Sequence, residues 1–574
     1  MALKQSDQAV GEVGDVQVLV NQVGYDAGGP KRVVLQCRKK PRQQAPRFSV
    51  LQAGTSQVLY AGGWERFGRV GKSSDDWGFH YWRGDFSELR RAARVCIETE
   101  VDGETYRSPP FEIGPDLLWK RLAPLVLDYF RRSRSTAKNG VLEEEGRYYD
   151  VSGAWCGLGD RGGTLMRDAW KVLWALVQAR QRDSFLEPVR GEMAYGSLWW
   201  KRIMIHYPRS GRLLSGVGGW RSQQGRIAWY DYPHGDQQHE KLMSLGLYLM
   251  LFRHLHDSGF LKRAEKMWLF YRDWITTDQI FSVYHEAVGA GGRGARSVRT
   301  SWPAPGRNVT LVDDAAFLFG DVEMFRELKQ RPYLEHAGEL VDRLLAEAQS
   351  PKTRRLQWNN FADHLHATSL AYFAALLPED PHSELIAREL ADFFDELVRK
   401  AEAASPFGIA RKNFAGCEAW RPRGRLKSVA TGFFDTSPRG TGLNLEYSLE
   451  AWQALWVSRV VPKPEYRRYA QAHIDWILGL NPRGLCMVKG VGSVVPPMAP
   501  GGAFDGCVCC GLVSDGRHDR PWLGTWPEAR DVAASEAADE DEADAATIAG
   551  HPVWAQSEAR LGATASLFLA LSMT

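Results

Sequence analysis

The spacing of apolar residues changes once along this chain of 574 residues, at Gly114–Pro115. Before this point, apolar residues alternate or run in short segments that end at glycine, proline or charged residues, a pattern that predicts β-strands. After it, eleven segments carry the spacing of α-helices, separated by loops rich in glycine, proline and tryptophan. Because the chain is also too long for one simple core, we expect a β-sandwich followed by a helical domain.

The helical part shows no alternation of strands and helices, which disfavours a doubly wound sheet or a TIM barrel. Its apolar stripes are broad, as expected for helices that pack on two sides. A closed ring of helix pairs or an α-solenoid fits this pattern better. We accordingly divide the chain into a flexible N-terminus (1–15), a β-sandwich (16–114) and a helical domain (115–574).

Charge and composition narrow the kinds of partner. The 72 Lys and Arg residues nearly balance the 69 Asp and Glu residues, and the formal net charge of +3 gives no support for a nucleic-acid or anionic-membrane partner. No run of 18 apolar residues is present, so no membrane span is expected. The 22 Trp and 19 Tyr residues suit stacking on sugar rings, although a large core would also need aromatic residues.

The N-terminal segment and the cysteines both predict a cytoplasmic protein. The segment "MALKQSDQAVGEVGDVQ" has no apolar h-region and no cleavage site, so no secretion signal is expected; a trimmed terminus would instead imply a secreted protein. The eight cysteines form no disulfide framework and are expected to be reduced. The "CVCC" cluster at 507–510, with Cys486 and His518 nearby, matches no usual spacing of zinc ligands, so no metal site is predicted there.

Several segments carry a family resemblance. They include "VLVNQVGYDAGGPKRVVLQ" (18–36), "YWRGDFSELRRAARVCIETEVDGETYRSPPFEIG" (81–114), "DVSGAWCGLGDRGG" (150–163), "HIDWILGLNPRGLCMVKGVG" (473–492) and "VWAQSEARLGATASLFLAL" (553–571). The first two resemble the ends of the immunoglobulin-like domain that precedes the catalytic domain in one branch of glycoside hydrolase family 9. The third resembles that family's catalytic-base loop, the fourth its late helix and Asn-Pro turn, and the fifth its last helix. Because these matches follow the family order along almost the whole chain, the protein is identified as a divergent member of that branch.

The resemblance implies an immunoglobulin-like β-sandwich followed by an (α/α)6 toroid, and an inverting hydrolase of β-linked glucan or glucosamine chains. Such an enzyme needs two carboxyl groups about 6.5–9.5 Å apart on opposite sides of the scissile bond. One activates a water, and the other, held protonated, donates to the leaving oxygen. By position in the family motifs, Asp160 is the general base and Glu558 the general acid. They lie 558 − 160 = 398 residues apart, so only a closed fold can bring them together.

The chain also departs from the family pattern. Gly157 stands where the family has a second aspartate that holds the attacking water, so Asp160 lacks that partner. Gly501, Gly502 and Ala503 stand where a "PHHR" motif binds glucose hydroxyls, and Ser557 replaces the Asn before the acid. The family's structural zinc ligands are missing from "FRRSRSTAKNG", so no zinc is expected. No cofactor is required by the resemblance, and calcium sites built from scattered oxygen atoms leave no motif that predicts their presence or loss.

Four further residues are candidates for binding an oligosaccharide. Trp155 either lines a sugar subsite or packs beneath the base loop. Trp554 either provides an apolar setting that raises the pKa of Glu558 or only packs. His518 and Arg520 lie between the Asn-Pro turn and the acid helix, where they could replace the missing sugar-binding side chains.

Three functional readings remain. The first is an inverting β-glycoside hydrolase, endoglucanase-like or exo-acting on short gluco- or glucosamine oligosaccharides; the acidic segment 528–550 is a candidate wall for exo action. The second is a catalytically weakened or inactive sugar-binding homologue, favoured by Gly157 and the lost "HHR". The third is another enzyme on a helical toroid, such as a polysaccharide lyase, which ranks last because no Tyr or His constellation stands out. The sequence makes no prediction of the oligomeric state.

Overall fold

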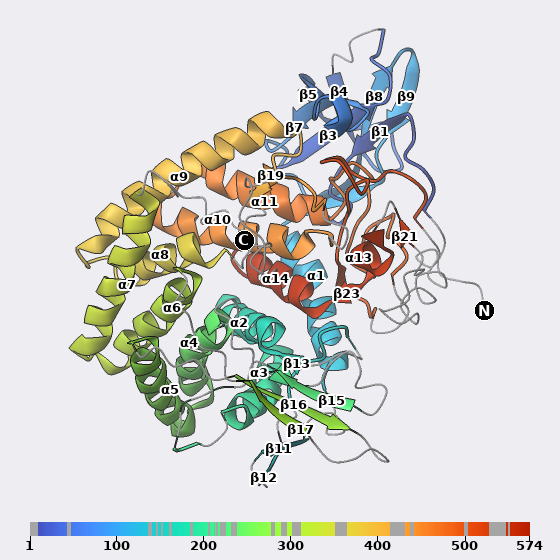
Figure 1. Ribbon diagram of the computed structural model, residues 1–574. Helices are drawn as coiled ribbons and strands as arrows, with labels where there is room; N and C mark the ends of the chain where they lie inside the picture. The colour runs from blue at the N-terminus through green and yellow to red at the C-terminus, as the bar shows by residue number, and fades with distance from the viewer. Residues whose placement is uncertain are drawn as a thin grey trace.

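The chain forms a β-sandwich and a larger helical domain that lie side by side in the computed structural model (Figure 1). The structure describes residues 10–42, 47–135, 141–144, 147–150, 153–159, 164–183, 187–204, 207–209, 211, 213, 216–217, 226–230, 238–276, 282–288, 296–300, 311–349, 364–413, 431–436, 441–498, 503–526, 547–548 and 551–574. The predicted order of a sandwich followed by a helical toroid is confirmed.

Two sheets make the sandwich, in the orders β1-β3-β7-β6 and β2-β10-β8-β4-β5, with β9 paired to β8. The strands are β1 (Val16–Leu19), β2 (Gly24–Asp26), β3 (Arg32–Cys37), β4 (Arg47–Gln52), β5 (Val58–Gly63), β6 (Glu65–Arg69), β7 (His80–Asp85), β8 (Ala93–Val101), β9 (Glu104–Arg107) and β10 (Phe111–Gly114). In β3, Val33 and Leu35 belong to the sandwich core, whereas Val34 belongs to the core of the helical domain. Because strand side chains alternate between faces, the unbroken apolar run of β3 reflects burial on both sides.

Six inner helices of the second domain pack in a closed ring, in the order α2, α4, α6, α8, α10 and α14, and each packs against one outer helix. The inner helices are α2 (Met166–Arg182), α4 (Gln238–Leu255), α6 (Leu311–Leu328), α8 (Leu365–Leu376), α10 (Asn444–Val460) and α14 (Leu561–Leu571). The outer helices are α1 (Leu117–Arg132), α3 (Glu187–Arg202), α5 (Ser258–Thr276), α7 (Arg331–Gln349), α9 (His382–Ala404) and α11 (Pro464–Ile477). This ring of helix pairs is the (α/α)6 toroid that the family resemblance implies.

Short elements connect the helices. They are β11 (Val141–Glu144), β12 (Arg147–Asp150), β13 (Thr164–Leu165), β14 (Gly216–Val217), β15 (Arg226–Tyr230), β16 (Ser282–Val288), β17 (Arg296–Thr300), β18 (Lys412–Asn413), β19 (Thr431–Gly432), β20 (Val508–Cys509), β21 (Thr547–Ile548), β22 (His551–Pro552), β23 (Ala559–Arg560) and the one-turn helix α13 (Trp554–Ser557). Strands β13 to β17 form one sheet in chain order, and β20 pairs with β23. The second pairing matters for the candidate site because Glu558 directly precedes β23.

Helix α6 is absent from the eleven predicted segments, and the structure corrects that count. Its residues from Val312 to Met324 are all buried, including the four acids Asp313, Asp314, Asp321 and Glu323. Helices α8 and α14 are also buried along their length, but their sequences are more apolar, whereas the four acids of α6 interrupt its apolar spacing. The acids are retained inside because they have partners: Arg343 donates to both carboxylate oxygens of Asp314, at 3.0 Å each.

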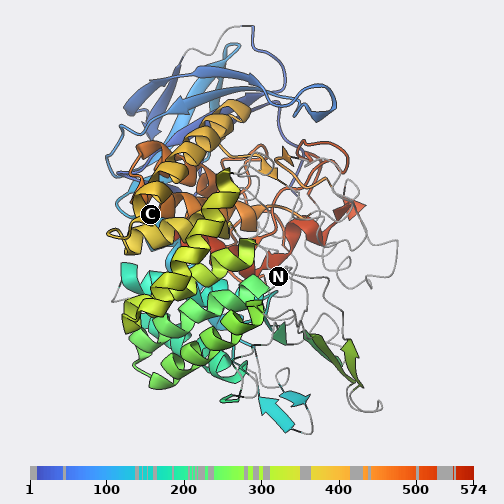
Figure 2. The same cartoon turned by 60° about the vertical axis from the view of Figure 1, so that its left-hand side comes forward.

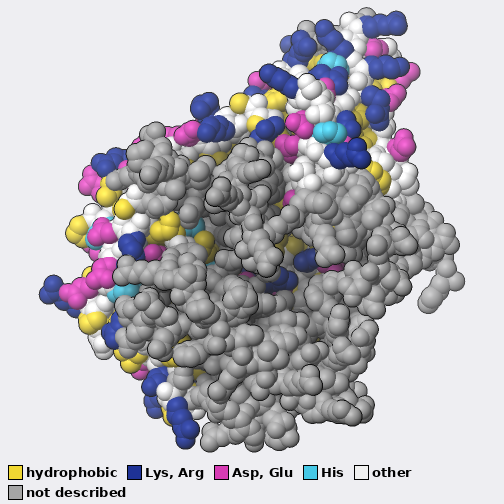
Figure 3. Space-filling model, viewed as in Figure 1, with side chains coloured by type: hydrophobic (Ala, Val, Ile, Leu, Met, Phe, Trp, Pro, Cys, Tyr) yellow, Lys and Arg dark blue, Asp and Glu magenta, His cyan; other side chains and the backbone are white. Residues whose placement is uncertain are grey.

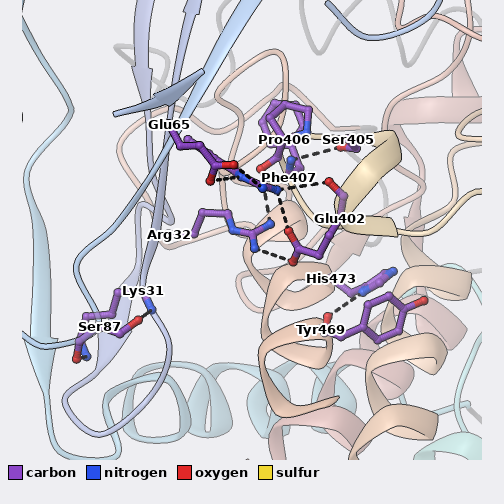
Figure 4. A network of polar contacts seen from close by, with 11 residues as sticks. Lys31, Arg32, Glu65, Ser87, Glu402, Ser405, Pro406, Phe407, Tyr469 and His473 are labelled. Atoms are coloured by element: carbon purple, nitrogen blue, oxygen red, sulfur yellow. Dashed lines mark hydrogen bonds and ion pairs between the residues drawn. The ribbon is translucent and has the colours of Figure 1, made fainter. Parts of the chain in front are cut away.

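The sandwich is fastened to the helical domain through α9 and α11 (Figure 2). Arg32 of the sandwich contacts one carboxylate oxygen of Glu402 in α9 at 2.6 Å (Figure 4). Arg83 of the sandwich contacts the other oxygen at 3.0 Å. The Asn21 amide donates to Asp475 of α11 at 2.8 Å. These polar contacts hold one face of the sandwich against the barrel.

The described part of the N-terminal segment is docked rather than free. Val10 and Trp526 exchange two backbone hydrogen bonds, of 3.2 and 2.8 Å, and Val13 is buried. Residues 1–9 of the segment predicted to be flexible lie outside the described residues. Among the described helices, none combines the length and apolar character needed to cross a membrane. Acidic and basic side chains are interspersed over the described surface in Figure 3.

Candidate active site

The predicted base loop reaches the start of the last inner helix. The Gly157 carbonyl accepts a 2.9 Å hydrogen bond from the Leu561 amide, the first residue of α14. On its other side, the loop is held by the end of α1, because the Cys156 amide donates to the Ser133 carbonyl at 2.7 Å. Asp160, the predicted base, follows Gly159 and lies outside the described residues. The described part of this loop therefore lies next to the segment that carries Glu558. The position of the Asp160 side chain is not part of the described structure.

Trp155 lies beneath this loop and is completely buried. Its indole nitrogen donates to Glu192 of α3 at 3.1 Å, and Arg134 binds the other oxygen of the same carboxylate at 2.7 Å. Its ring packs directly on Gly196, where a larger residue would collide with it, and contacts Tyr195 edge to face. Of the two roles considered for Trp155, these contacts favour packing over stacking on a sugar, because no ring face is exposed.

Glu558 lies between α13 and β23 and is 3% exposed. Its carbonyl accepts a 3.0 Å hydrogen bond from the Cys510 amide, which follows β20. Ser557, at the position of the family Asn, donates to the Val553 carbonyl at 2.8 Å. The backbone around Glu558 is therefore fixed by a neighbouring strand and by its own helical turn.

An arginine that sequence reasoning missed binds Glu558. Arg560 Nε lies 2.6 Å from Glu558 Oε2, and the two side chains are 24% and 4% exposed. Burial alone would lower the pKa of Arg560, but the negative charge of Glu558, supported by that of Asp168, outweighs it and raises that pKa. By the same attraction, the guanidinium favours the ionised form of Glu558. The sequence offered no signal for this contact beyond the closeness of the two residues along the chain.

Asp168 of α2 is a second acid near the start of α14. It is 7% exposed and packs against Gly562, beside Leu445 of α10. A side chain at Gly562 would collide with the Asp168 carboxylate. The close approach shows that α2, α10 and α14 begin at the same face of the toroid, which is the face that carries Glu558.

His518 and Arg520 share a partner within their own hairpin. His518 Nδ1 lies 3.0 Å from Asp515 Oδ2, and Arg520 Nε donates to the same oxygen at 2.5 Å. Although burial raises the pKa of Asp515, hydrogen bonds from His518, Arg520 and the Arg517 amide prevail and lower it to about 2. The two predicted sugar-binding side chains remain 34% and 42% exposed. They are thus ordered by Asp515 and still reach the surface.

Asp519 connects the same hairpin to the β-sandwich. Its carboxylate accepts hydrogen bonds from the Phe433 and Phe434 amides at 2.6 and 3.1 Å. Its carbonyl accepts a 3.0 Å bond from the Trp77 indole, and its amide donates to Asp75 at 3.1 Å. Burial raises the pKa of Asp519 to about 6, against the opposing effects of Arg411 and the two amides.

The remaining site residues are described only in part. Trp554 begins α13, but its side chain lies outside the described part of the structure, as do Gly501 and Gly502. Ala503 is 6% exposed. In the residues that the structure describes, no three His, Cys, Asp or Glu side chains are grouped so as to hold a metal ion.

Comparisons with known proteins agree with this architecture. Residues 14–104 match the model of the cellulase N-terminal Ig-like domain, and residues 259–500 match that of glycosyl hydrolase family 9. No curated protein matches the chain.

Three solved structures are similar over nearly their whole length. A metagenome-derived glycoside hydrolase family 9 endoglucanase is 18% identical with a TM-score of 0.62, covering 97% of this chain and 98% of its own. A single mutant of a thermostable endoglucanase from Alicyclobacillus acidocaldarius, and AaCel9A in complex with cellobiose-like isofagomine, are each 16% identical with a TM-score of 0.62, covering 97% of this chain and 99% of theirs. At such low identity the solved structures show the fold alone. The assignment to a family rests on the two family models. The chain is a divergent member of glycosyl hydrolase family 9, and hence a glycoside hydrolase.

Proposed function

We propose that this protein is an inverting β-glycoside hydrolase in which Asp160 is the general base and Glu558 the general acid. The single observation that carries the proposal is the hydrogen bond from the Leu561 amide to the Gly157 carbonyl. It joins the loop that leads to Asp160 to the helix that follows Glu558. Two carboxyl groups supplied from these two segments are what an inverting mechanism requires.

In this mechanism, Asp160 takes a proton from a water as that water attacks the anomeric carbon. Glu558 gives its proton to the leaving oxygen on the opposite side of the sugar. The buried backbone around Glu558 supports its role, because fixed geometry in the ground state lowers the cost of reaching the transition state. Gly157 leaves the water with one carboxylate acceptor fewer than in the family pattern.

For the substrate, we propose a β-linked gluco- or glucosamine oligosaccharide, cleaved internally or from one end. A similar solved structure is a complex with a cellobiose-like isofagomine, which supports a glucose-type substrate. His518 and Arg520 are partly exposed on a hairpin whose base is bonded to the Glu558 carbonyl, so we assign them to sugar hydroxyls near the acid. Trp554, whose backbone is four residues before Glu558, remains a candidate for the apolar setting of the acid.

A second candidate function is a weakened or inactive sugar-binding homologue. Two observations favour it: Gly157 replaces an aspartate, and the Arg560 guanidinium lies 2.6 Å from Glu558 Oε2, where its charge opposes the protonated carboxyl that a general acid needs. Such a protein would still bind sugars but turn them over slowly or not at all.

An activity screen distinguishes an active hydrolase from an inactive sugar-binding homologue. The full chain would be tested on chromogenic β-glucosides and β-glucosaminides and on β-linked oligosaccharides, with product anomers followed by NMR. We expect turnover with inversion, abolished by Glu558→Gln and by Asp160→Asn but unaffected by Glu98→Gln in the sandwich. Sugar binding without turnover would favour the second candidate. Undiminished turnover in both active-site variants would exclude Asp160 and Glu558 as the catalytic pair.

A further inference from the structure

The ion pair between Arg560 and Glu558 stands out among the polar contacts of the candidate site. The two atoms Nε and Oε2 are 2.6 Å apart, which places the two opposite charges in direct contact as an ion pair. The Glu558 side chain is only 4% exposed, so bulk water screens the pair weakly. A positive charge held in this way acts directly on the group that is proposed to donate the proton.

The backbone fixes both partners. Arg560 lies in β23 opposite Val508 of β20, and the Cys510 amide donates to the Glu558 carbonyl at 3.0 Å. The Arg560 carbonyl accepts a 2.8 Å bond from Thr564 in the first turn of α14. Glu558 directly precedes β23, so one strand residue, Ala559, separates the two partners along the chain. The contact therefore follows from local structure and does not depend on a long flexible loop.

The other charged or titratable groups around the pair come from three elements. Asp168 of α2 and Cys510 beside β20 both interact electrostatically with Arg560, and Glu446 of α10 interacts with Cys510. Burial raises the pKa of Cys510 to about 12, so its thiol is neutral. Arg167 lies 3.7 Å from Asp168 and is 39% exposed. Among these described neighbours, Asp168 and Glu446 are acids that oppose ionisation of Glu558, and Arg560 is the cation in contact with it.

We propose that Arg560 is a positioning residue that orients Glu558 and holds it ionised in the free protein, so that turnover is confined to acidic pH; this role rests on the proposed function. A general acid must carry its proton when the substrate binds. An adjacent guanidinium shifts the loss of that proton to lower pH. Arg560 thereby sets the alkaline limb of the pH profile without touching the substrate.

The pH dependence of kcat/KM tests this role in the full-length protein. In Arg560→Gln, the alkaline limb should move to higher pH by about one to three units, the range for loss of a close opposite charge. In Arg560→Lys, which keeps the charge but not the planar geometry, the limb should move less. Arg107→Gln is the matched control, because Arg107 forms an exposed pair with Glu98 in the sandwich, and its profile should match that of the wild type.

The failure of this inference can be told apart from failure of the proposed function. An unchanged limb in Arg560→Gln, with Glu558→Gln inactive, overturns the role of Arg560 alone. Full activity in Glu558→Gln overturns the catalytic assignment instead.

If the wild type shows no turnover, a double-mutant cycle on thermal unfolding tests whether Arg560 and ionised Glu558 stabilise each other. The variants are Arg560→Gln, Glu558→Gln and their combination, each measured at pH 7 and pH 3. A stabilising coupling that is present at pH 7 and lost at pH 3 supports the ionised pair, and absence of coupling at both pH values overturns it.

Discussion

The Gly157 carbonyl accepts a hydrogen bond of 2.9 Å from the Leu561 amide, across 561 − 157 = 404 residues of sequence. The first amides of a helix have no partner within the helix, so the base loop satisfies one end of α14. That bond uses only the backbone of Gly157. The position where the family has a water-holding aspartate is therefore anchored through its backbone, so a new side chain there would not remove this bond.

Replacing Gly157 by Asp should restore the missing acceptor. Gly153 and Gly159 of the same loop have positive φ values of 115° and 80°, whereas Gly157 is not among the described glycines with positive φ. A second carboxylate beside Asp160 would hold the attacking water, and we expect kcat to rise by about tenfold or more, in the range of positioning effects. Steady-state kinetics on the best substrate of the screen would measure it.

The control places the same side chain at Gly153. Because φ there is 115°, Asp at this position is strained, and the melting temperature should fall with no gain in kcat. A Gly157→Asp variant that folds normally and is no faster than the wild type would show that the missing aspartate does not limit turnover.

A buried ion pair in the barrel predicts a large loss of stability. Lys412 contacts Glu450 with both side chains fully buried, and Tyr469 donates to the other Glu450 oxygen at 2.6 Å. Glu450→Gln leaves a buried lysine without its counter-charge, which should cost about 3–5 kcal/mol of unfolding free energy. Glu396→Gln is the control, because Glu396 forms an exposed pair with Lys400 that contributes less than about 1 kcal/mol. Urea denaturation would measure both.

The same ion pair predicts how the free energy of unfolding changes at acidic pH. Burial would raise the pKa of Glu450, but Lys412, His364 and His473 outweigh it and lower the pKa to about 2. Because the folded-state pKa lies below the unfolded value, the stabilisation is present above about pH 4.5 and is lost as pH falls toward 2. If the wild type and Glu450→Gln lose equal amounts of unfolding free energy across this pH window, protonation of Glu450 is not the cause of the loss.

Asp475 should show the opposite dependence. Burial raises its pKa to about 7, despite hydrogen bonds from Gln471 and from Asn21 of the sandwich. The unfolded chain releases this proton near pH 4 and the folded chain near pH 7, so stability falls as pH rises through that window, by up to about 4 kcal/mol.

The variant Asp475→Asn removes the charge and keeps an acceptor for both donors. Its melting temperature relative to the wild type should therefore increase from pH 4 to pH 8, as followed by circular dichroism. Asp15→Asn, at an exposed carboxylate, should show no such trend. A difference that stays constant with pH would mean that Asp475 does not titrate in this range.

The periodicity of the chain predicted the two domains because outer helices such as α9 expose one face to water. It did not reveal α6, whose apolar spacing is interrupted by four buried acids, or the contacts made across the ring. The family motifs led to Glu558 by position, yet Arg560, two residues later, was missed because no spacing rule assigns a charged neighbour to a catalytic acid. Trp155 was open between stacking and packing, since an aromatic residue has the same sequence signature in a cleft and beneath a loop.

The last prediction concerns the coupling of the sandwich to the candidate site. Trp77 is 2% exposed, packs against Phe433 and Trp476, and donates its indole proton to the Asp519 carbonyl at 3.0 Å. The hairpin that carries Asp519 continues from Cys510, whose amide holds the Glu558 carbonyl. Trp77→Phe should therefore lower kcat/KM several-fold, besides costing about 1–2 kcal/mol of unfolding free energy for the lost hydrogen bond.

Trp64→Phe is the matched control. Trp64 donates its indole proton to Thr99 at 3.0 Å within the sandwich core, so this variant loses the same kind of bond at a distance from the barrel. Its unfolding free energy should fall by a similar amount while kcat/KM, measured well below the melting temperature, stays at the wild-type value. If the two variants lower kcat/KM equally, the effect is one of general stability, and the sandwich does not position the hairpin beside Glu558.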